Sequence, residues 1–363
     1  MSVRGSFRRV LVVTPLGEGG AGGIDRMMDA LRPRNDEFAR EGFEVEFGTS
    51  RGAGSLALAP FHLAATLGRV AASALGRGPH LLHINLSSHG STLRKLAIAA
   101  TARRVGAPYF VHLHGSRFAE YFDRGGPRLR AAIVRLFEGA AGVVVLGSVW
   151  RDWLAARAPA ARIDILPNAV AAPARLAPRA PGAPVHILFL GRIGPRKGAD
   201  DLLLALAALR AGPWRATLAG DGDVAGARAT VMRLGMGERV SVLGWVGPDD
   251  VRALLEDCDV VALPSHQENL PMSLIEGMAH GRAVIGTPVG AVADIVRPGE
   301  TGLMVTPGDV PALAAALHGL IDDPALRARF GAAAQRSHRE LFDLDSYVGR
   351  LAAIWRSAQM PVG

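Results

Sequence analysis

The chain of 363 residues is 49% apolar and 20% charged, a balance typical of a soluble globular protein. Its length exceeds that of one ordinary hydrophobic core and predicts two domains of typical size. The single cysteine, Cys258, excludes an intramolecular disulfide, and its place at the start of an apolar run predicts a small core residue.

The net charge of +8 is unevenly distributed along the chain. Residues 1–180 contain 24 Arg and Lys and 13 Asp and Glu, whereas residues 181–363 contain 17 and 20. This asymmetry predicts an anionic partner for the first half. We do not expect nucleic acid to be that partner, because the basic residues do not interleave with aromatic residues in a recognisable module.

Two apolar segments of the first half bear on membrane insertion. The run Val10–Val13 follows basic residues but is too short for the core of a secretory signal, and it predicts a first β-strand. The longer window Leu56–Leu75 is interrupted by a proline, a histidine and Arg69, so it does not predict a spanning helix. We therefore expect a cytoplasmic protein that at most attaches to the inner surface of the cytoplasmic membrane.

Short apolar runs alternate with helical stretches, the pattern of parallel sheets with crossover helices. The strands expected in the first half are Val10–Val13, Val45–Phe47, Leu81–Ile84, Tyr109–Leu113, Gly142–Leu146 and Ile163–Leu166. The strands expected in the second half are His186–Leu190, Arg215–Leu218, Val240–Leu243, Val260–Leu263, Ala283–Ile285 and Gly302–Val305. A segment rich in Pro and Ala separates the two sets. The sequence thus predicts two Rossmann-like domains, residues 1–172 and 185–343, joined by a linker over residues 173–184.

Three helices are expected after the last strand. They are Asp309–Ile321, Pro324–Leu341 and an amphipathic final helix, Leu344–Ser357. The expected apolar face of the final helix comprises Tyr347, Leu351, Ile354 and Trp355.

A glycine-rich loop, Gly17–Ile24, follows the first strand and precedes a helix. Glycines at such a turn let the backbone approach a ligand and present N–H groups to a phosphate or carboxylate. The loop lacks the spacing of a dinucleotide fingerprint, and no Walker lysine follows it. A flexible turn without a ligand has the same composition, so the loop alone leaves both interpretations open.

Two histidines, His112 and His114, alternate along a predicted buried strand that ends before Gly115. They therefore share one face of the sheet, and we expect His114 to reach the site at the strand's carboxyl end. The alternative is a hydrogen-bonded core histidine. We do not expect a metal pair, because no third ligand is spaced nearby.

A basic loop, Gly191–Gly198, follows the first strand of the second half. Arg192 and Lys197 flank a Gly-Pro turn before a helix, so their cationic groups can converge on a diphosphate. Only two lysines occur in the chain, which favours a specific requirement at Lys197. We expect Arg196 to be solvated.

The stretch Asp259–His280 combines a short buried strand, the polar loop Pro264–Asn269 and a helix that begins with Pro271. A loop at the carboxyl end of a strand, followed by a helix N-terminus, is where an open α/β sheet binds anions and sugars. Glu268 lies in the loop and Glu276 on the helix. The two carboxylates are therefore placed to hold different ends of one ligand.

These motifs together resemble those of the retaining glycosyltransferases of the GT-B fold, most closely glycosyltransferase family 4. The resemblance covers essentially the whole chain and rests on Glu268 and Glu276 with Pro271, Gly191-Arg192, Lys197-Gly198, Gly220-Asp221-Gly222, Asn168, Gly22-Gly23 and His114-Gly115. It implies two tandem Rossmann-like α/β domains with a cleft between them, and a C-terminal helix over residues 344–359 that crosses back to the first domain. The first domain would bind the acceptor and the second the donor.

The resemblance further implies a metal-independent hexosyltransferase without a cofactor, whose donor is a UDP- or GDP-sugar. Glu276 is expected to bind the ribose. Trp245 and Val246 lie where such families place the base, although packing explains a tryptophan after a strand equally well. The acceptor is expected to be a glycan or a lipid-pyrophosphate-linked sugar, in exopolysaccharide or cell-envelope glycan assembly.

The residues expected to act in catalysis are His114, Arg192, Lys197 and Glu268. Glu268 is expected to hold the transferred hexose, together with the backbone N–H groups of Asn269 and Leu270. His114 would contact the same hexose across the cleft.

The diphosphate leaving group carries the charge that develops during transfer. Arg192 and Lys197 are expected to neutralise it, since departing charge needs a preorganised positive partner. Gly22 and Gly23 would lie near the phosphates or the acceptor.

Three other functions are alternatives. A glycosidase also uses paired carboxylates, but it explains neither Arg192 nor Lys197 nor the tandem pattern. A sugar-nucleotide epimerase of the same fold is a closer alternative. A non-catalytic nucleotide-sugar-binding scaffold is the third, and the presence of Glu268, Glu276, Arg192 and Lys197 argues against it.

The positive charge of the first half is concentrated in residues 94–135. This stretch contains nine cations: Arg94, Lys95, Arg103, Arg104, Arg117, Arg124, Arg128, Arg130 and Arg135. Phe118, Tyr121, Phe122, Leu129 and Leu136 lie among or beside them. We therefore predict that it docks the first domain on an anionic membrane, each surface cation contributing about 1 kcal/mol. A solvated helix face is the alternative.

Overall fold

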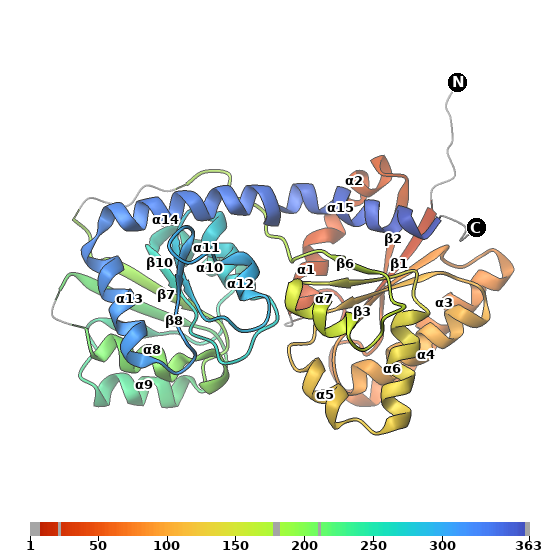
Figure 1. Cartoon of the computed structure of the whole chain (residues 1–363), viewed down its shortest axis with the longest axis horizontal. Coiled ribbons are helices and arrows are strands. Elements are labelled where there is room, and N and C mark those ends of the chain that lie inside the picture. Colours follow the sequence, from red (N-terminus) through yellow and green to blue (C-terminus); the bar gives the residue numbers. More distant parts are fainter. Residues whose placement is uncertain (1–7, 21–22, 177–181, 210–211, 360–363) are drawn as a thin grey trace. The chain divides into compact units, whose positions relative to one another are not determined.

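A computed structural model describes residues 8–20, 23–176, 182–209 and 212–359 (Figure 1). The chain forms two compact units, one from the residues up to Asn168 together with those from Asp345 onward, the other from Ala169–Leu344. The boundary predicted from sequence lay a few residues later, at the start of the linker 173–184. Residues 177–181 of that linker lie outside the described residues.

The first unit contains a parallel sheet in the order β2-β1-β3-β4-β5-β6. Its strands are β1 Arg8–Thr14, β2 Phe43–Thr49, β3 Leu81–Leu86, β4 Tyr109–Leu113, β5 Gly142–Val145 and β6 Ile163–Ile165. Its helices are α1 Gly23–Leu31, α2 Asn35–Arg40, α3 Ala59–Ala71, α4 Gly90–Arg104, α5 Phe118–Arg124, α6 Pro127–Glu138, α7 Ser148–Ala155 and, from Asp345 onward, α15 Leu344–Arg356. Every residue of β3 and β4 is buried, as expected for strands covered by helices on both faces.

The final helix α15 packs on the first unit, as the family resemblance implies. Tyr347, Leu351 and Trp355 are buried along one face of this helix. The Trp355 ring stacks on Phe38 of α2, and its edge meets Phe43 of β2. The chain therefore completes the core of its first unit with its last helix.

The second unit contains a parallel sheet in the order β12-β11-β10-β7-β8-β9. Its strands are β7 Val185–Leu190, β8 Trp214–Ala219, β9 Val240–Val242, β10 Val260–Ala262, β11 Ala283–Gly286 and β12 Gly302–Met304. Its helices are α8 Ala199–Ala207, α9 Val224–Arg233, α10 Pro248–Asp257, α11 Met272–Ala279, α12 Val292–Ile295, α13 Val310–Asp322 and α14 Pro324–Ser337. The sequence-based prediction of two parallel-sheet α/β units is therefore confirmed.

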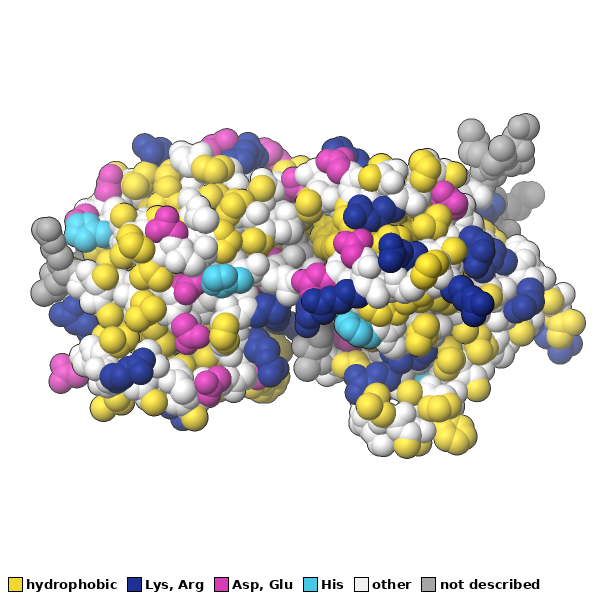
Figure 2. Space-filling model, turned by 60° about the horizontal axis from the view of Figure 1, so that its bottom comes forward, with side chains coloured by type: hydrophobic (Ala, Val, Ile, Leu, Met, Phe, Trp, Pro, Cys, Tyr) yellow, Lys and Arg dark blue, Asp and Glu magenta, His cyan; other side chains and the backbone are white. Residues whose placement is uncertain are grey.

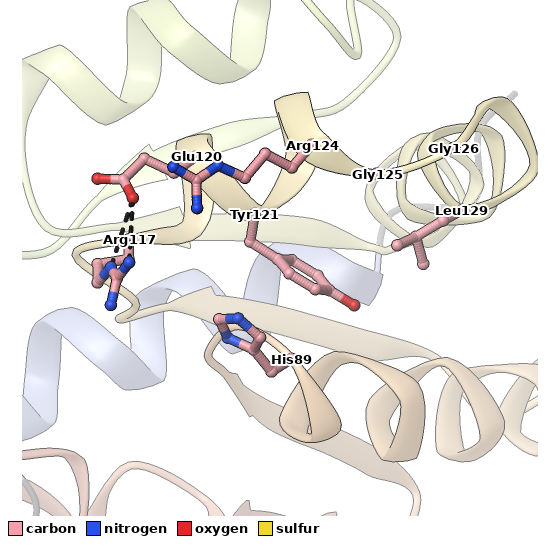
Figure 3. A pocket seen from close by; sticks show the side chains of 8 residues that line it. All are labelled: His89, Arg117, Glu120, Tyr121, Arg124, Gly125, Gly126 and Leu129. Carbon is pink, nitrogen blue, oxygen red and sulfur yellow. Dashed lines mark hydrogen bonds and ion pairs between the residues drawn. The ribbon is translucent and has the colours of Figure 1, made fainter.

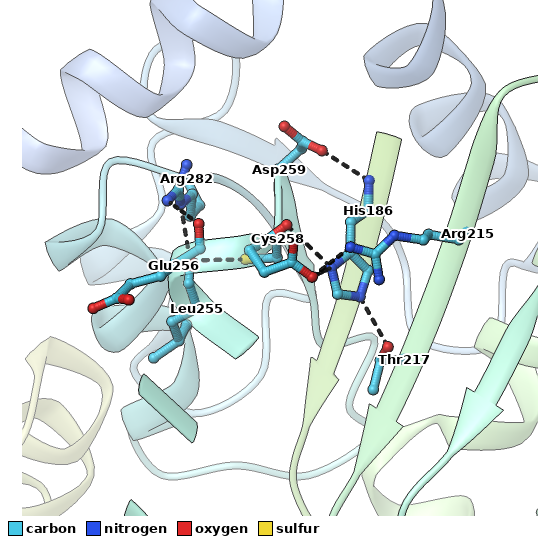
Figure 4. Close-up of polar contacts among 9 residues, drawn as sticks. His186, Arg215, Thr217, Leu255, Glu256, Cys258, Asp259 and Arg282 are labelled. Carbon is cyan, nitrogen blue, oxygen red and sulfur yellow. Dashed lines mark hydrogen bonds and ion pairs between the residues drawn. The ribbon is translucent and has the colours of Figure 1, made fainter. Parts of the chain in front are cut away.

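Buried polar contacts fix the C-terminal end of α10 against the sheet (Figure 4). Arg282 donates to the carbonyl oxygens of Leu255 and Glu256 at 3.0 and 2.8 Å. These carbonyls belong to the last helical turn, where a cation satisfies unpaired acceptors and complements the helix dipole. Cys258 is fully buried beside them, which confirms its expected place in the core. His186 is also buried, 2.8 Å from the hydroxyl of Thr217.

Part of the stretch 94–135, which is predicted to dock on a membrane, does not reach the surface. Lys95 is fully buried, and the apolar residues Phe118, Phe122 and Leu136 belong to the core of the first unit. Charge density along the sequence did not reveal that these side chains point into the fold. Within the described residues, one helical segment, Leu56–Leu75, is long and apolar enough to cross a membrane by length and composition alone, and little of it is buried.

Candidate functional site

The order of the second sheet indicates where a ligand binds. Strands β7 and β10 are parallel neighbours, and the chain leaves them towards opposite edges of the sheet. In open α/β sheets, the crevice outside the carboxyl ends of two such strands is the usual ligand site. The loop 191–198 leaves the end of β7, and the loop 263–271 leaves the end of β10. Both loops carry residues predicted from sequence.

Glycine allows the two loops to touch. Gly198, before α8, has a φ of 70°, and a Cβ atom there would lie 2.0 Å from the carbonyl oxygen of Pro264. Hydrogen bonds extend the contact, from the His266 N–H to the Arg196 carbonyl at 3.0 Å and from the Arg196 guanidinium to the Gln267 carbonyl at 3.3 Å. The prediction that Arg196 is only solvated is therefore wrong, because this residue joins the two loops.

The Lys197 ammonium group contacts the Glu268 carboxylate directly. Ser265 donates its hydroxyl proton to the same Glu268 oxygen at 2.8 Å. Both Glu268 and Ser265 are buried. The sequence placed Lys197 and Glu268 in one site but did not predict their mutual contact, and it missed Ser265 because a serine in a polar loop carries no distinctive signal.

A third loop, between β11 and α12, forms hydrogen bonds with the backbone of the loop that carries Glu268. Ala291 donates its N–H to the carbonyl of Asn269 at 2.7 Å, and the Thr287 hydroxyl donates to the carbonyl of Ser265 at 2.6 Å. Gly290 has a φ of 58°, and a Cβ atom there would lie 2.4 Å from the Glu268 carbonyl oxygen. These supporting residues were not predicted from the sequence.

The Asn269 side chain is buried, and both of its amide atoms lack a hydrogen-bond partner among the described residues. A buried amide without partners costs roughly 1–3 kcal/mol per unsatisfied group, so such a group needs an explanation. Its position beside Glu268 makes a polar ligand the simplest one. Leu270 is buried next to it.

The other residues predicted for the second unit lie around this centre. Arg192 is exposed and pairs with Asp221 at 2.9 Å, whereas Lys197 pairs with Glu268. Glu276 is half-buried on α11. Trp245 follows β9 and is 72% exposed, which removes core packing as its explanation. Val246 beside it is half-buried.

In the first unit, His114 lies at the carboxyl end of β4. Its Nε2 is 2.8 Å from the side-chain oxygen of Asn85, and the Asn85 amide donates to the carbonyl of Val13 at 3.2 Å. Burial, and then the nearby His83, lower the pKa of His114 to about 3. His114 is therefore a neutral imidazole that donates through Nε2 at physiological pH.

His114 stacks against a chain of buried histidines that the sequence revealed only in part. The centroids of the His114 and His112 rings are 4.0 Å apart, and His112 Nδ1 lies 3.2 Å from His83 Nε2. Trp355 donates to His83 Nδ1 at 3.2 Å. His83 was missed because it lies on β3, far from His112 in sequence. Within the described part of the chain, no group of three or more His, Cys, Asp or Glu has a geometry suited to a metal ion.

The glycine-rich loop contacts α1 through Asp25. The buried Asp25 carboxylate accepts the N–H groups of Leu16 and Gly17 at 3.1 and 3.2 Å. Burial raises the pKa of this carboxyl. Gly23 is the exposed first residue of α1, and Gly22 lies outside the described residues.

A cavity of about 330 Å³ lies beside α5 (Figure 3). The rings of Tyr121 and His89 both line it and contact each other, with centroids 4.9 Å apart and planes tilted by 41°. Arg117 pairs with Glu120 at 3.4 Å on its rim. Aromatic rings and charged groups together make this cavity a candidate ligand site.

Comparison with known proteins identifies the family. Residues 4–169 match the model described as "Glycosyl transferase 4-like domain", and residues 184–323 match "Glycosyl transferases group 1". The 2-deoxystreptamine glucosyltransferase of Streptomyces kanamyceticus is 35% identical over 68% of this chain and 69% of its own. The 2-deoxystreptamine N-acetyl-D-glucosaminyltransferase of Streptomyces fradiae is 32% identical over 70% and 66%, respectively.

Solved structures share the fold at low sequence identity. Sucrose-phosphate synthase from Thermosynechococcus elongatus has a TM-score of 0.77 at 20% identity, covering 96% of this chain and 98% of its own. Anabaena HepE, solved with UDP and glucose, has a TM-score of 0.73 at 21% identity, covering 96% and 100%. The chain therefore belongs to the group 1 and 4-like glycosyltransferase family and is a glycosyltransferase of the GT-B fold.

Proposed function

We propose that this glycosyltransferase moves a hexose from a UDP- or GDP-sugar to its acceptor with retention of anomeric configuration. The observation that carries the proposal is the buried Glu268, contacted by Lys197 and Ser265 beside the unpaired amide of Asn269. These groups lie where an open sheet binds its ligand. They supply a carboxylate for sugar hydroxyls and a cation for phosphate.

The proposed donor lies along the carboxyl edge of the second sheet. Glu276 binds the ribose, and the exposed Trp245 ring, with Val246, offers a surface for the base. Glu268 binds the hexose hydroxyls, assisted by the backbone N–H groups of Asn269 and Leu270.

Arg192 and Lys197 stabilise the charge on the departing diphosphate, a role that a divalent cation has in metal-dependent transferases. Without donor, their charges are balanced by Asp221 and Glu268. A bound diphosphate competes for the same cations. We therefore propose a metal-independent reaction without a cofactor.

His114 contributes a neutral imidazole from the first unit. Because its Nε2 hydrogen is held by Asn85, its Nδ1 is free to accept a hydrogen bond from a hexose hydroxyl. Gly23 and the glycine-rich loop are proposed to lie near the phosphates or acceptor.

The acceptor in this proposal is a glycan or a lipid-linked sugar of envelope or exopolysaccharide assembly, bound by the first unit of a cytoplasmic, peripheral protein. Seven of the nine cations in residues 94–135 remain exposed, and Figure 2 shows Lys and Arg side chains on the surface of this unit, on the right. The exposed apolar residues Leu56, Leu58 and Phe61 would enter the interface. Vesicle binding that did not increase with anionic lipid content, or did not weaken with salt, would contradict docking on an anionic membrane.

A panel of UDP- and GDP-sugars tests the donor proposal. A matching donor raises the melting temperature by mass action. If none of the sugars raises the melting temperature, the proposal is contradicted. Lys197→Gln should lower the rate of transfer about 100-fold or more. Arg252→Gln, which breaks an exposed ion pair with Asp249 in the same unit, should not change it. Product analysis distinguishes transfer with retention from epimerisation, and binding without turnover would indicate a scaffold.

A further inference from the structure

The first unit has its own crevice between strands that the chain leaves in opposite directions, at the carboxyl ends of β1 and β3. A cavity of about 530 Å³ lies there. Arg51, which follows β2, and Arg94, on the first turns of α4, both line it. Its lining also includes Ser87, Ser88 and Ser91. The cavity is thus rich in hydrogen-bond donors and in positive charge.

The two arginines lack the carboxylate partners that guanidinium groups usually have. The Nε atom of each is buried without a hydrogen-bond partner among the described residues. Burial, and then the neighbouring Arg51, lower the pKa of Arg94, so the two charges lie close enough to repel. Two unpaired like charges in one cavity are unfavourable unless an anion joins them.

The remaining charges of the cavity do not cancel this pair. Asp25 lines it, but its carboxylate is engaged by the N–H groups of Leu16 and Gly17. Lys95, the residue after Arg94, is fully buried and contacts the hydroxyl of Ser50. One carboxylate therefore faces two guanidinium groups and a buried amine.

The start of α4 adds further donors at the same place. The helix begins at Gly90 in the cavity lining, and the preceding residue, His89, provides no side-chain cap. The unpaired N–H groups of a first helical turn carry partial positive charge and bind anions. His89 has a φ of 59°, uncommon outside glycine, so the backbone is held in a strained conformation beside the cavity.

We propose that this cavity binds a phosphate group of the acceptor, held between Arg51 and Arg94. A phosphate offers several oxygens to two guanidinium forks, serine hydroxyls and helix N–H groups at once. The proposal deepens the proposed function, on which it rests, by giving the acceptor a phosphate. It also predicts a difference from the relatives named for 2-deoxystreptamine, because two unpaired guanidinium groups repel a cationic amine.

Calorimetry on the full chain tests this proposal without a donor. The background variant carries Arg192→Gln and Lys197→Gln, so that phosphate cannot bind at the proposed donor site. Glucose 6-phosphate and glucose are the charged and uncharged probes, and inorganic phosphate is the minimal one. We expect glucose 6-phosphate to bind at least 10-fold more tightly than glucose, and each of Arg51→Gln and Arg94→Gln to reduce that affinity at least 10-fold.

Arg104→Gln is the matched control, since it removes an exposed cation from the far end of α4. It should leave the affinity unchanged, and Arg51→Lys and Arg94→Lys should retain part of it, which separates charge from a folding defect. A second arm uses vesicles containing phosphatidylinositol phosphate, to distinguish a lipid headgroup from a free sugar phosphate. Arginine-dependent binding in either arm supports the proposal and identifies the source of the phosphate. Absence of phosphate preference in both arms, or equal binding by the Gln variants, would overturn it. Donor binding and hydrolysis, measured separately, report on the proposed function itself.

Discussion

Lys197 and Glu268 come from loops 71 positions apart in the sequence and form a direct ion pair beside the carboxyl ends of β7 and β10. The Glu268 side chain is only 6% exposed and that of Lys197 16%. Each charge therefore depends on the other for compensation, because a buried ion without a partner is costly. The same pair is proposed to separate when a diphosphate and a hexose bind.

A double-mutant cycle should reveal this dependence. Glu268→Gln and Lys197→Gln should each lower the free energy of unfolding, whereas the double variant should lose less than the sum of the two. We expect a coupling of about 1–3 kcal/mol, measured by urea denaturation. The exposed pair Arg252 and Asp249 is the control and should couple by no more than about 0.5 kcal/mol. Equal coupling in the two pairs would show that Glu268 is compensated by other groups.

Gly290 should be needed for donor binding because its backbone lies against the Glu268 loop. In Gly290→Ala the new methyl group meets the Glu268 carbonyl oxygen, and the residue must also keep a positive φ. We expect donor affinity to fall at least 10-fold while the secondary structure is retained. Gly299→Ala is the control, since Gly299 also has a positive φ, 77°, but open space around it. Backbone strain alone costs about 1–2 kcal/mol in both variants. A similar loss of donor affinity in the two would mean that the clash has no effect on the site.

The fold could be predicted from sequence because strand signals are local. The predicted strand Tyr109–Leu113 has the bounds of β4, since its apolar run and its flanking residues lie in one short window. The contacts of the site could not be predicted in the same way. Lys197 meets Glu268, and His83 meets His112, only because particular strands become neighbours, and residue spacing does not encode strand order. The burial of Lys95 was missed for a different reason, since charge density along a helix does not show which side of it faces the core.

Lys95 should make stability depend on pH. Burial, and then Arg94, lower its pKa from 10.5 to about 7 in the folded protein. Between pH 7 and 10.5 the unfolded chain therefore binds this proton and the folded one does not, so the contribution of Lys95 to stability rises with pH across that window. Below pH 7 Lys95 is protonated in both states, and the free-energy cost of burying its charge is greatest and does not change with pH.

The variant Lys95→Met removes this titration and should be more stable than the natural chain near neutral pH. Each tenfold change in proton affinity is worth about 1.4 kcal/mol, so the gain should reach a few kcal/mol at pH 7. The gain should shrink towards pH 10. Arg104→Met, an exposed cation on the same helix, should show no such pH dependence. Parallel pH profiles for the natural chain and Lys95→Met, from urea midpoints between pH 6 and 9.5, would contradict the lowered pKa.

The indole of Trp355 should stabilise the first unit specifically. It donates to the buried His83 and packs against Phe38 and Phe43, so Trp355→Phe loses a hydrogen bond and leaves a void. We expect a loss of about 1–3 kcal/mol. Hydrogen exchange locates the effect, because protection should fall in β1 to β4 and not in β7 to β12. Trp245→Phe is the control, since the 72% exposed Trp245 should contribute less than about 0.5 kcal/mol to stability. Unchanged protection of β3 in Trp355→Phe would show that the histidine chain is held in place without α15.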